Sequence, residues 1–171
     1  IKYNKADAIT RCYQTEFRAG EEEGVIMGTP IVLEQETDLG YYTEIIDRNA
    51  LNNTDFKDVF LFVNHDINKI PLARSRNNTG SSTMHLQVDN EGLHMRATLD
   101  VKNNSEASSL YSAVTRGDMD GMSFMFYVDK DEWSDLDTDK PKRRILSIPK
   151  VFEVSAVNYP AYPQTSLSAR D

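Results

Sequence analysis

The sequence has few cysteines and histidines, fewer basic than acidic residues, and no long apolar run. It contains a single cysteine, Cys12, so an internal disulfide bond is excluded and a reducing compartment is favoured. Only three of the 171 residues are histidines, which leaves few candidates for a general base. Basic residues are outnumbered by acidic ones, 19 to 27, and the net charge of −8 argues against binding to nucleic acid or to an anionic membrane. No apolar run approaches the length of a membrane span, and no signal-peptide pattern is present.

The composition is that of an ordinary globular domain. Hydrophobic residues make up 39% and charged residues 27% of the chain, and no internal repeat is visible. We therefore predict one domain over residues 1–171, which is long enough to bury a core without disulfide or metal support. Residues 1–23 are expected to include a loose N-terminal arm, and residues 129–142 an exposed, charged excursion.

Short apolar or alternating segments predict a mainly β chain. The expected strands are residues 24–33, 59–63, 84–88, 93–99, 122–128, 144–148 and 151–157. Pro30 in the first of them indicates an edge strand or a bulge. Residues 34–53 are predicted as a long loop with a short helix around 44–50, and residues 158–166 as a closing turn.

One helix is expected, with a hydroxyl N-cap at Ser105 and an end at Arg116-Gly117. The fold class that follows is mixed α/β and mainly β. We expect a single-domain β-barrel of six or seven strands, or a sandwich, with a few helical additions.

Three segments far apart in the sequence each present one residue that a hydrolase uses. They are Asn64-His65-Asp66, Gly121-Met122-Ser123-Phe124 and Phe152-Glu153-Val154-Ser155. Histidine, serine and a carboxylate are the chemical parts of an acyl-transfer site. The chain order differs from those of the best-known serine hydrolases, but a triad is recognised by geometry and not by order.

The histidine and the serine each have an ordinary structural explanation beside the catalytic one. His65 follows an apolar strand, where a base is well presented, but a surface histidine at a strand end is equally expected. Ser123 lies among large apolar residues, where its hydroxyl needs a partner that a histidine or the backbone would supply. Gly121 would permit close approach of the backbone at an oxyanion pocket. His85 and His94 are interpreted as strand-face residues.

The acidic member has two candidates. Glu153 points opposite to its chain neighbours by strand alternation, as Ser155 does, so it faces either water or His65. Asp66 competes for the same role and ranks lower, because neighbours on a strand point to opposite faces. Arg143 and Arg144 could supply positive charge near an oxyanion. The favoured interpretation is that they only balance the negative charge of the acidic segment that precedes them.

The sequence resembles the prohead (procapsid) maturation proteases of tailed bacteriophages, which are relatives of the herpesvirus assemblin proteases. The resemblance extends from about Gly24 to the end of the chain, and the order and spacing of its motifs are more specific than any one of them. The matching segments are residues 23–26 (EGVI), 58–66 (DVFLFVNHD), 71–74 (PLAR), 91–93 (EGL), 114–124 (VTRGDMDGMSF) and 152–163 (FEVSAVNYPAYP).

The resemblance implies an assemblin-like fold and a serine endopeptidase that uses no cofactor and no metal. It implies a catalytic triad with His65 as base, Ser123 as nucleophile and Glu153 as third member. Assemblins have a second histidine at the position of the third member. The implied substrates are the scaffold segment of the major capsid protein and the protease itself. The implied location is the immature capsid in the host cytoplasm, and self-association is a further expectation.

Two other functions are compatible with the same residues. One is a non-catalytic capsid-assembly or scaffold component with this fold, for which Ser123 would be dispensable. The other is a metal-dependent hydrolase that uses His65 with Asp66 and is inhibited by chelators. No histidine, cysteine or carboxylate spacing resembles a zinc site, so the metal hypothesis has the weaker support.

Overall fold

The computed structural model describes residues 7–13 and 17–158 of the chain. Within these ranges it contains thirteen β-strands, one α-helix and one short 3₁₀ helix, η2 (Arg76–Asn78). The prediction of a mainly β fold is therefore confirmed. No helix in the described part of the chain is long and apolar enough to cross a membrane.

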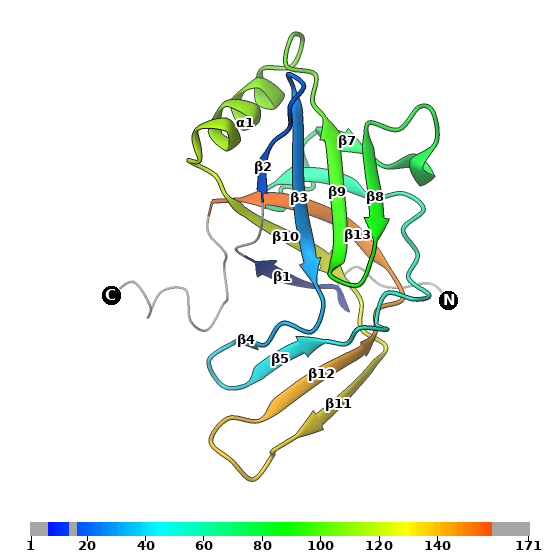
Figure 1. Ribbon diagram of the computed structural model, residues 1–171, viewed down its shortest axis with the longest axis vertical. Helices are drawn as coiled ribbons and strands as arrows, with labels where there is room; N and C mark the ends of the chain where they lie inside the picture. Colours follow the sequence, from blue (N-terminus) through cyan, green and yellow to red (C-terminus); the bar gives the residue numbers. More distant parts are fainter. Residues whose placement is uncertain (1–6, 14–16, 159–171) are drawn as a thin grey trace.

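The strands form three sheets (Figure 1). The five-stranded sheet has the spatial order β1 (Ile9–Tyr13), β10 (Gly121–Phe126), β13 (Val151–Val157), β6 (Phe60–Val63) and β7 (Ala73–Arg74). The second sheet has the order β2 (Phe17–Ala19), β3 (Val25–Val32), β9 (Gly92–Thr98) and β8 (Met84–Val88). The third sheet has the order β11 (Lys130–Ser134), β12 (Lys142–Ser147), β5 (Thr43–Ile46) and β4 (Thr37–Asp38).

The first two sheets pack against each other with crossed strands, as Figure 1 shows for β3 in front of β10. The helix α1 (Ser105–Arg116) covers one end of this pair and contacts β2 and β3. A common apolar core joins all these elements and includes the buried side chains of Ile26, Leu61, Leu110, Phe124 and Ile145. Its burial from water is the main favourable contribution to the stability of such a domain.

The prediction of a six- or seven-stranded barrel is only partly confirmed. All seven expected strands are present, but the described residues contain further strands and form three separate sheets, without one closed barrel. The register of β3 against β9 shifts between Gly28 and Ile31, which places Pro30 in a bulge as predicted. The predicted closing turn over residues 158–166 lies, apart from Asn158, outside the described residues.

The helix lies where the sequence predicts it, but its N-cap is Asn104 and not Ser105. The Asn104 side-chain oxygen accepts hydrogen bonds from the backbone N–H groups of Glu106 and Ala107, at 3.0 and 3.3 Å. Asparagine and serine are both good N-caps, so residue type alone does not distinguish between the two adjacent candidates. The helix ends at Gly117, which adopts the left-handed conformation expected of a C-cap glycine.

The predicted helix around residues 44–50 is wrong, and the loop predicted over residues 34–53 is interrupted by two short strands. The segment contains β4 and β5, and β5 pairs in parallel with β12. Glu44 of β5 is only 2% exposed and is paired with two arginines, Arg11 and Arg143. A buried acidic residue breaks the apolar alternation by which a strand is recognised, so the sequence pattern predicts a polar loop.

Two segments that were expected to be irregular also contribute strands. Within residues 1–23, predicted to include a loose arm, β1 joins the five-stranded sheet and β2 joins the second sheet. Within residues 129–142, the exposed strand β11 pairs with β12. The neighbour of β1 in its sheet is β10, the strand that carries Ser123.

Candidate active site

His65 lies in a tight turn directly after β6. Asn64 and His65 both have positive φ angles, 52° and 56°, a left-handed conformation that asparagine and histidine adopt more readily than most residues. The turn is fixed to the end of β13, because the N–H of Asn64 donates to the carbonyl of Ala156 (2.8 Å) and its side chain accepts from the N–H of Asn158 (3.1 Å). These bonds hold the imidazole in place beside the sheet.

Ser123 and Glu153 lie on two neighbouring strands, β10 and β13. Ser123 is paired directly with Ser155, and Glu153 comes two residues before Ser155, so the three side chains share one face of the sheet. Ser123 and Ser155 have no exposed surface, and Glu153 is 2% exposed. Buried polar groups of this kind are stable only when they are hydrogen-bonded.

The structure brings all three predicted residues together. The Nε2 atom of His65 lies 2.5 Å from Oγ of Ser123, and its Nδ1 atom is hydrogen-bonded to Oε1 of Glu153. Glu153, and not Asp66, is thus the carboxylate in contact with the imidazole. Serine, imidazole and carboxylate form one continuous chain of hydrogen bonds, which is the connectivity of a nucleophile, a base and the group that orients the base.

A fourth side chain, Ser155, belongs to this network and was not predicted. Its hydroxyl donates to Oε2 of Glu153 (2.8 Å) and accepts the backbone N–H of His65 (3.1 Å). Ser155 therefore holds the carboxylate and the turn together. The signal was present in the sequence, since strand alternation puts Ser155 on the same face as Glu153.

The strand β1 closes the other side of Ser123. The Oγ atom of Ser123 donates a hydrogen bond to the carbonyl oxygen of Arg11 (2.9 Å), and Cys12 is the residue paired with Ser123 across the two strands. Cys12 is buried and its side chain is hydrogen-bonded to His65. The single cysteine of the chain is thus part of the surroundings of the imidazole, which the sequence did not indicate.

The environment of His65 favours its protonated form. Burial lowers the pKa of the imidazole, but hydrogen bonds with Cys12 and Glu153, together with the charge of Glu153, outweigh burial and raise the pKa from 6.5 to about 9. At neutral pH the ring is then an imidazolium, in which Nδ1–H and Nε2–H are both donors.

The other residues considered from the sequence lie elsewhere. His85 and His94 are in the β8–β9 hairpin, where His94 contacts Asp89 and Thr29. Asp89, Glu91 and His94 form the one group in the described part of the chain whose ligand atoms are close enough together for a metal ion, and it is largely exposed. Gly121 begins β10 and is paired with Val157.

Arg143 and Arg144 have carboxylate partners. Arg143 pairs with Glu44 and Asp131, and Arg144 pairs with Glu34 and Asp47. These contacts agree with the interpretation that both arginines balance acidic residues. Only Asp131 among their partners comes from the acidic segment 129–142.

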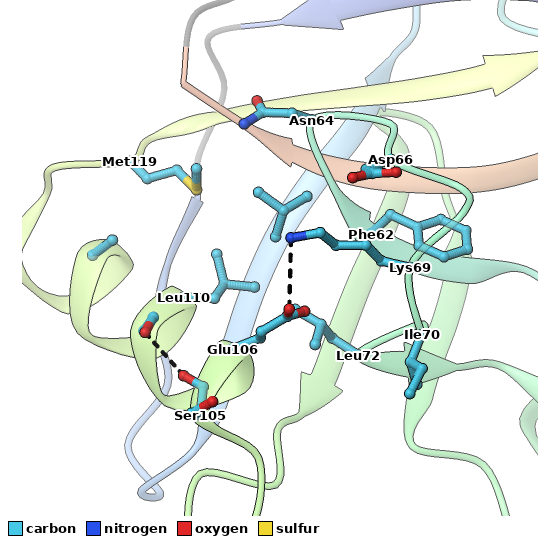
Figure 2. A pocket seen from close by; sticks show the side chains of 13 residues that line it. Phe62, Asn64, Asp66, Lys69, Ile70, Leu72, Ser105, Glu106, Leu110 and Met119 are labelled. Carbon is cyan, nitrogen blue, oxygen red and sulfur yellow. Dashed lines mark hydrogen bonds and ion pairs between the residues drawn. The ribbon is translucent and has the colours of Figure 1, made fainter.

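An open cavity of about 640 Å³ adjoins the His65 turn (Figure 2). It lies between that turn, β6 and α1, and apolar side chains such as Phe62, Leu110 and Met119 line it. Lys69 and Glu106 form an ion pair across it, with Nζ and Oε1 3.6 Å apart. A second hollow is lined by Glu153 itself and again by Phe62. Ser123 lines neither of these two hollows, in keeping with its complete burial.

Comparison with known proteins gives two matches. The family model described as caudovirus prohead serine protease matches residues 13–171. A protein named prohead protease, from Enterobacteria phage HK97, is 30% identical over 122 residues, which cover 71% of this chain and 48% of the relative. The chain therefore spans about half the length of the curated relative that it matches. No solved structure matches.

Proposed function

The chain belongs to the caudovirus prohead serine protease family, and from this premise we propose that it is an endopeptidase with Ser123 as nucleophile, His65 as general base and Glu153 as the carboxylate that orients the base. The observation that carries the proposal is the continuous hydrogen-bonded chain from Oγ of Ser123 through the imidazole to Glu153. A buried carboxylate and a buried hydroxyl that converge on one imidazole are costly to maintain, and such arrangements cluster at functional sites.

The chemistry is acyl transfer in two stages. In its neutral form His65 carries a proton on Nδ1, facing Glu153, and accepts the Ser123 proton at Nε2 while Oγ attacks a peptide carbonyl. The resulting imidazolium gives this proton to the leaving amine, and an acyl-enzyme remains on Ser123. Water then attacks the ester with His65 again as base, which releases the second product and restores the serine. Glu153 fixes the tautomer, and Ser155 fixes Glu153.

The substrate that we propose is the scaffold segment of a capsid protein, together with the protease itself, inside an immature capsid. The family match and the name of the HK97 relative support this assignment. The open cavity next to His65 offers apolar walls to a substrate side chain. Self-association of the enzyme is part of the same proposal, since enclosure of many copies in one shell raises their local concentration.

The proposal is tested with a fluorophosphonate probe, which reacts with activated serines. Over an extended incubation we expect an adduct on Ser123, mapped by peptide mass spectrometry, and a labelling rate on the order of 10³-fold lower in His65→Ala. His94→Ala is the matched control, because His94 also pairs with a carboxylate, Asp89, but in the β8–β9 hairpin. Labelling of His65→Ala at the unmodified rate, or no adduct on Ser123, would favour the non-catalytic assembly role instead.

The raised pKa of His65 predicts a rise of activity with pH. Because only the neutral imidazole accepts the serine proton, the labelling rate should increase about tenfold per pH unit below pH ~9 and level off above it.

The protonated form of His65, in contrast, stabilises the folded state. This contribution is complete below the unfolded pKa near 6.5 and is lost as pH rises through about 9. Labelling rates with circular dichroism at each pH separate the two effects, and a flat profile would contradict the prediction.

A further inference from the structure

The candidate nucleophile is closed to solvent in this structure. Ser123 has no exposed surface, whereas 19% of the His65 side chain is exposed. A peptide carbonyl has to come within about 3 Å of Oγ for attack. Hydrolysis at Ser123 therefore requires that some covering group move away first.

The covering element on one side is β1. It is the edge strand of the five-stranded sheet and pairs with β10 in antiparallel register, with Cys12 opposite Ser123. The carbonyl of Arg11 accepts the hydroxyl proton of Ser123 (2.9 Å). Since a hydroxyl has one proton, this carbonyl competes directly with Nε2 of His65 for the proton that catalysis must transfer.

A partly buried ion pair holds β1 on this edge. The guanidinium of Arg11 makes two hydrogen bonds to the Glu44 carboxylate, at 2.7 and 3.0 Å, in a bidentate arrangement. Glu44 belongs to β5 of the third sheet and also accepts a hydrogen bond from Arg143 (3.1 Å). The match to the protease family begins at residue 13, so nearly all of β1 precedes the matched region.

We propose that β1 occupies the edge of β10 at which an extended peptide substrate pairs, and that β1 separates from β10 before cleavage. The inference rests on the proposed function. An exposed strand edge binds an extended peptide through its backbone N–H and carbonyl groups, and β1 now satisfies those groups along β10. Departure of β1 would expose the edge, free the Ser123 proton for His65 and admit a substrate strand next to Oγ.

The test uses two rates measured on the same protein. Alkylation of Cys12, the single thiol, reports separation of β1 and does not depend on catalysis. Fluorophosphonate labelling reports access to Ser123. Arg11→Gln removes the charged bonds to Glu44 while Arg143 still pairs with that carboxylate, and we expect both rates to rise by the same factor, roughly tenfold to a hundredfold. Arg143→Gln is the matched control, because it removes a guanidinium from Glu44 without touching β1, and neither rate should rise.

The outcomes separate the two proposals. Faster alkylation of Cys12 with unchanged Ser123 labelling would overturn the role of β1 and leave the proposed function standing. Absence of any Ser123 adduct in both proteins, with Cys12 reacting faster, would overturn the proposed function and this inference with it. Equal acceleration in Arg143→Gln would show that general loosening is responsible, and would also overturn the role of β1.

A second variant makes the test independent of the stability of Arg11→Gln. Thr10 and Met125 are directly paired across β1 and β10, so cysteines at both positions are close enough for a disulfide bond. We expect the oxidised Thr10→Cys/Met125→Cys protein to lose Ser123 labelling by at least about tenfold, and to recover it on reduction. Equal labelling of the oxidised and reduced forms would contradict the proposal.

Discussion

Replacement of Ser123 by alanine is expected to abolish peptide-bond cleavage, with a loss on the order of 10⁶-fold in rate. The variant lacks the atom that forms the acyl bond in the proposed mechanism, which is the hydroxyl hydrogen-bonded to Nε2 of His65. The assay is cleavage of a peptide library, or of a co-expressed scaffold-bearing capsid protein, followed by mass spectrometry.

A buried serine elsewhere in the fold provides a control variant that distinguishes loss of catalysis from loss of stability. Ser75 is 1% exposed and its hydroxyl accepts the backbone N–H of Val59 (2.8 Å), so Ser75→Ala also leaves a buried polar group unpaired, at a cost of about 1–3 kcal/mol in the free energy of unfolding. We expect Ser75→Ala to lower the melting temperature and to retain cleavage. Cleavage by Ser123→Ala above background would rule out Ser123 as nucleophile.

Replacement of Glu153 by glutamine is expected to lower kcat/KM by about 10⁴-fold. A glutamine amide that donates to Nδ1 of His65 moves the imidazole proton to Nε2, where it faces Ser123 and prevents the ring from accepting a proton. The same change removes a charge and a hydrogen bond that raise the pKa of His65, so this pKa should fall. Nitrogen NMR of the imidazole measures the tautomer and the pKa directly.

Two further variants show whether the effect is specific to Glu153. Asp66→Asn tests the other carboxylate next to His65 in the chain, and we expect it to keep most of the activity. Ser155→Ala removes only the group that holds Glu153, and a loss of about tenfold is expected. A larger loss in Asp66→Asn than in Glu153→Gln would transfer the orienting role to Asp66.

Much of the site could be predicted because its residues interrupt regular patterns. Ser123 stands out in a run of large apolar side chains, and His65 stands out at the end of the apolar strand β6. Glu153 could be placed on one face of its strand by alternation. That this face meets His65 could not be predicted, because it depends on the parallel pairing of β13 with β6.

The remainder depends on contacts between segments whose own sequences are unremarkable. Cys12 and Arg11 lie in a polar N-terminal segment with no strong strand pattern. Their positions depend on the pairing of β1 with β10 and on the ion pair between Arg11 and Glu44. From the sequence alone Glu44 is expected at the surface, since charged side chains are rarely buried without a partner. The sequence therefore locates the groups proposed for the chemistry better than the groups that enclose them.

The position of β13 in its sheet has a consequence for synthesis. This strand lies between β10, which carries Ser123, and β6, which leads into His65, although it follows both of them along the chain. While a ribosome has translated only as far as β12, the serine and the histidine are already present but the strand that sets their spacing is not. Under the proposed mechanism, the hydrogen-bonded site therefore forms only after β13, which also carries Glu153, has been synthesised.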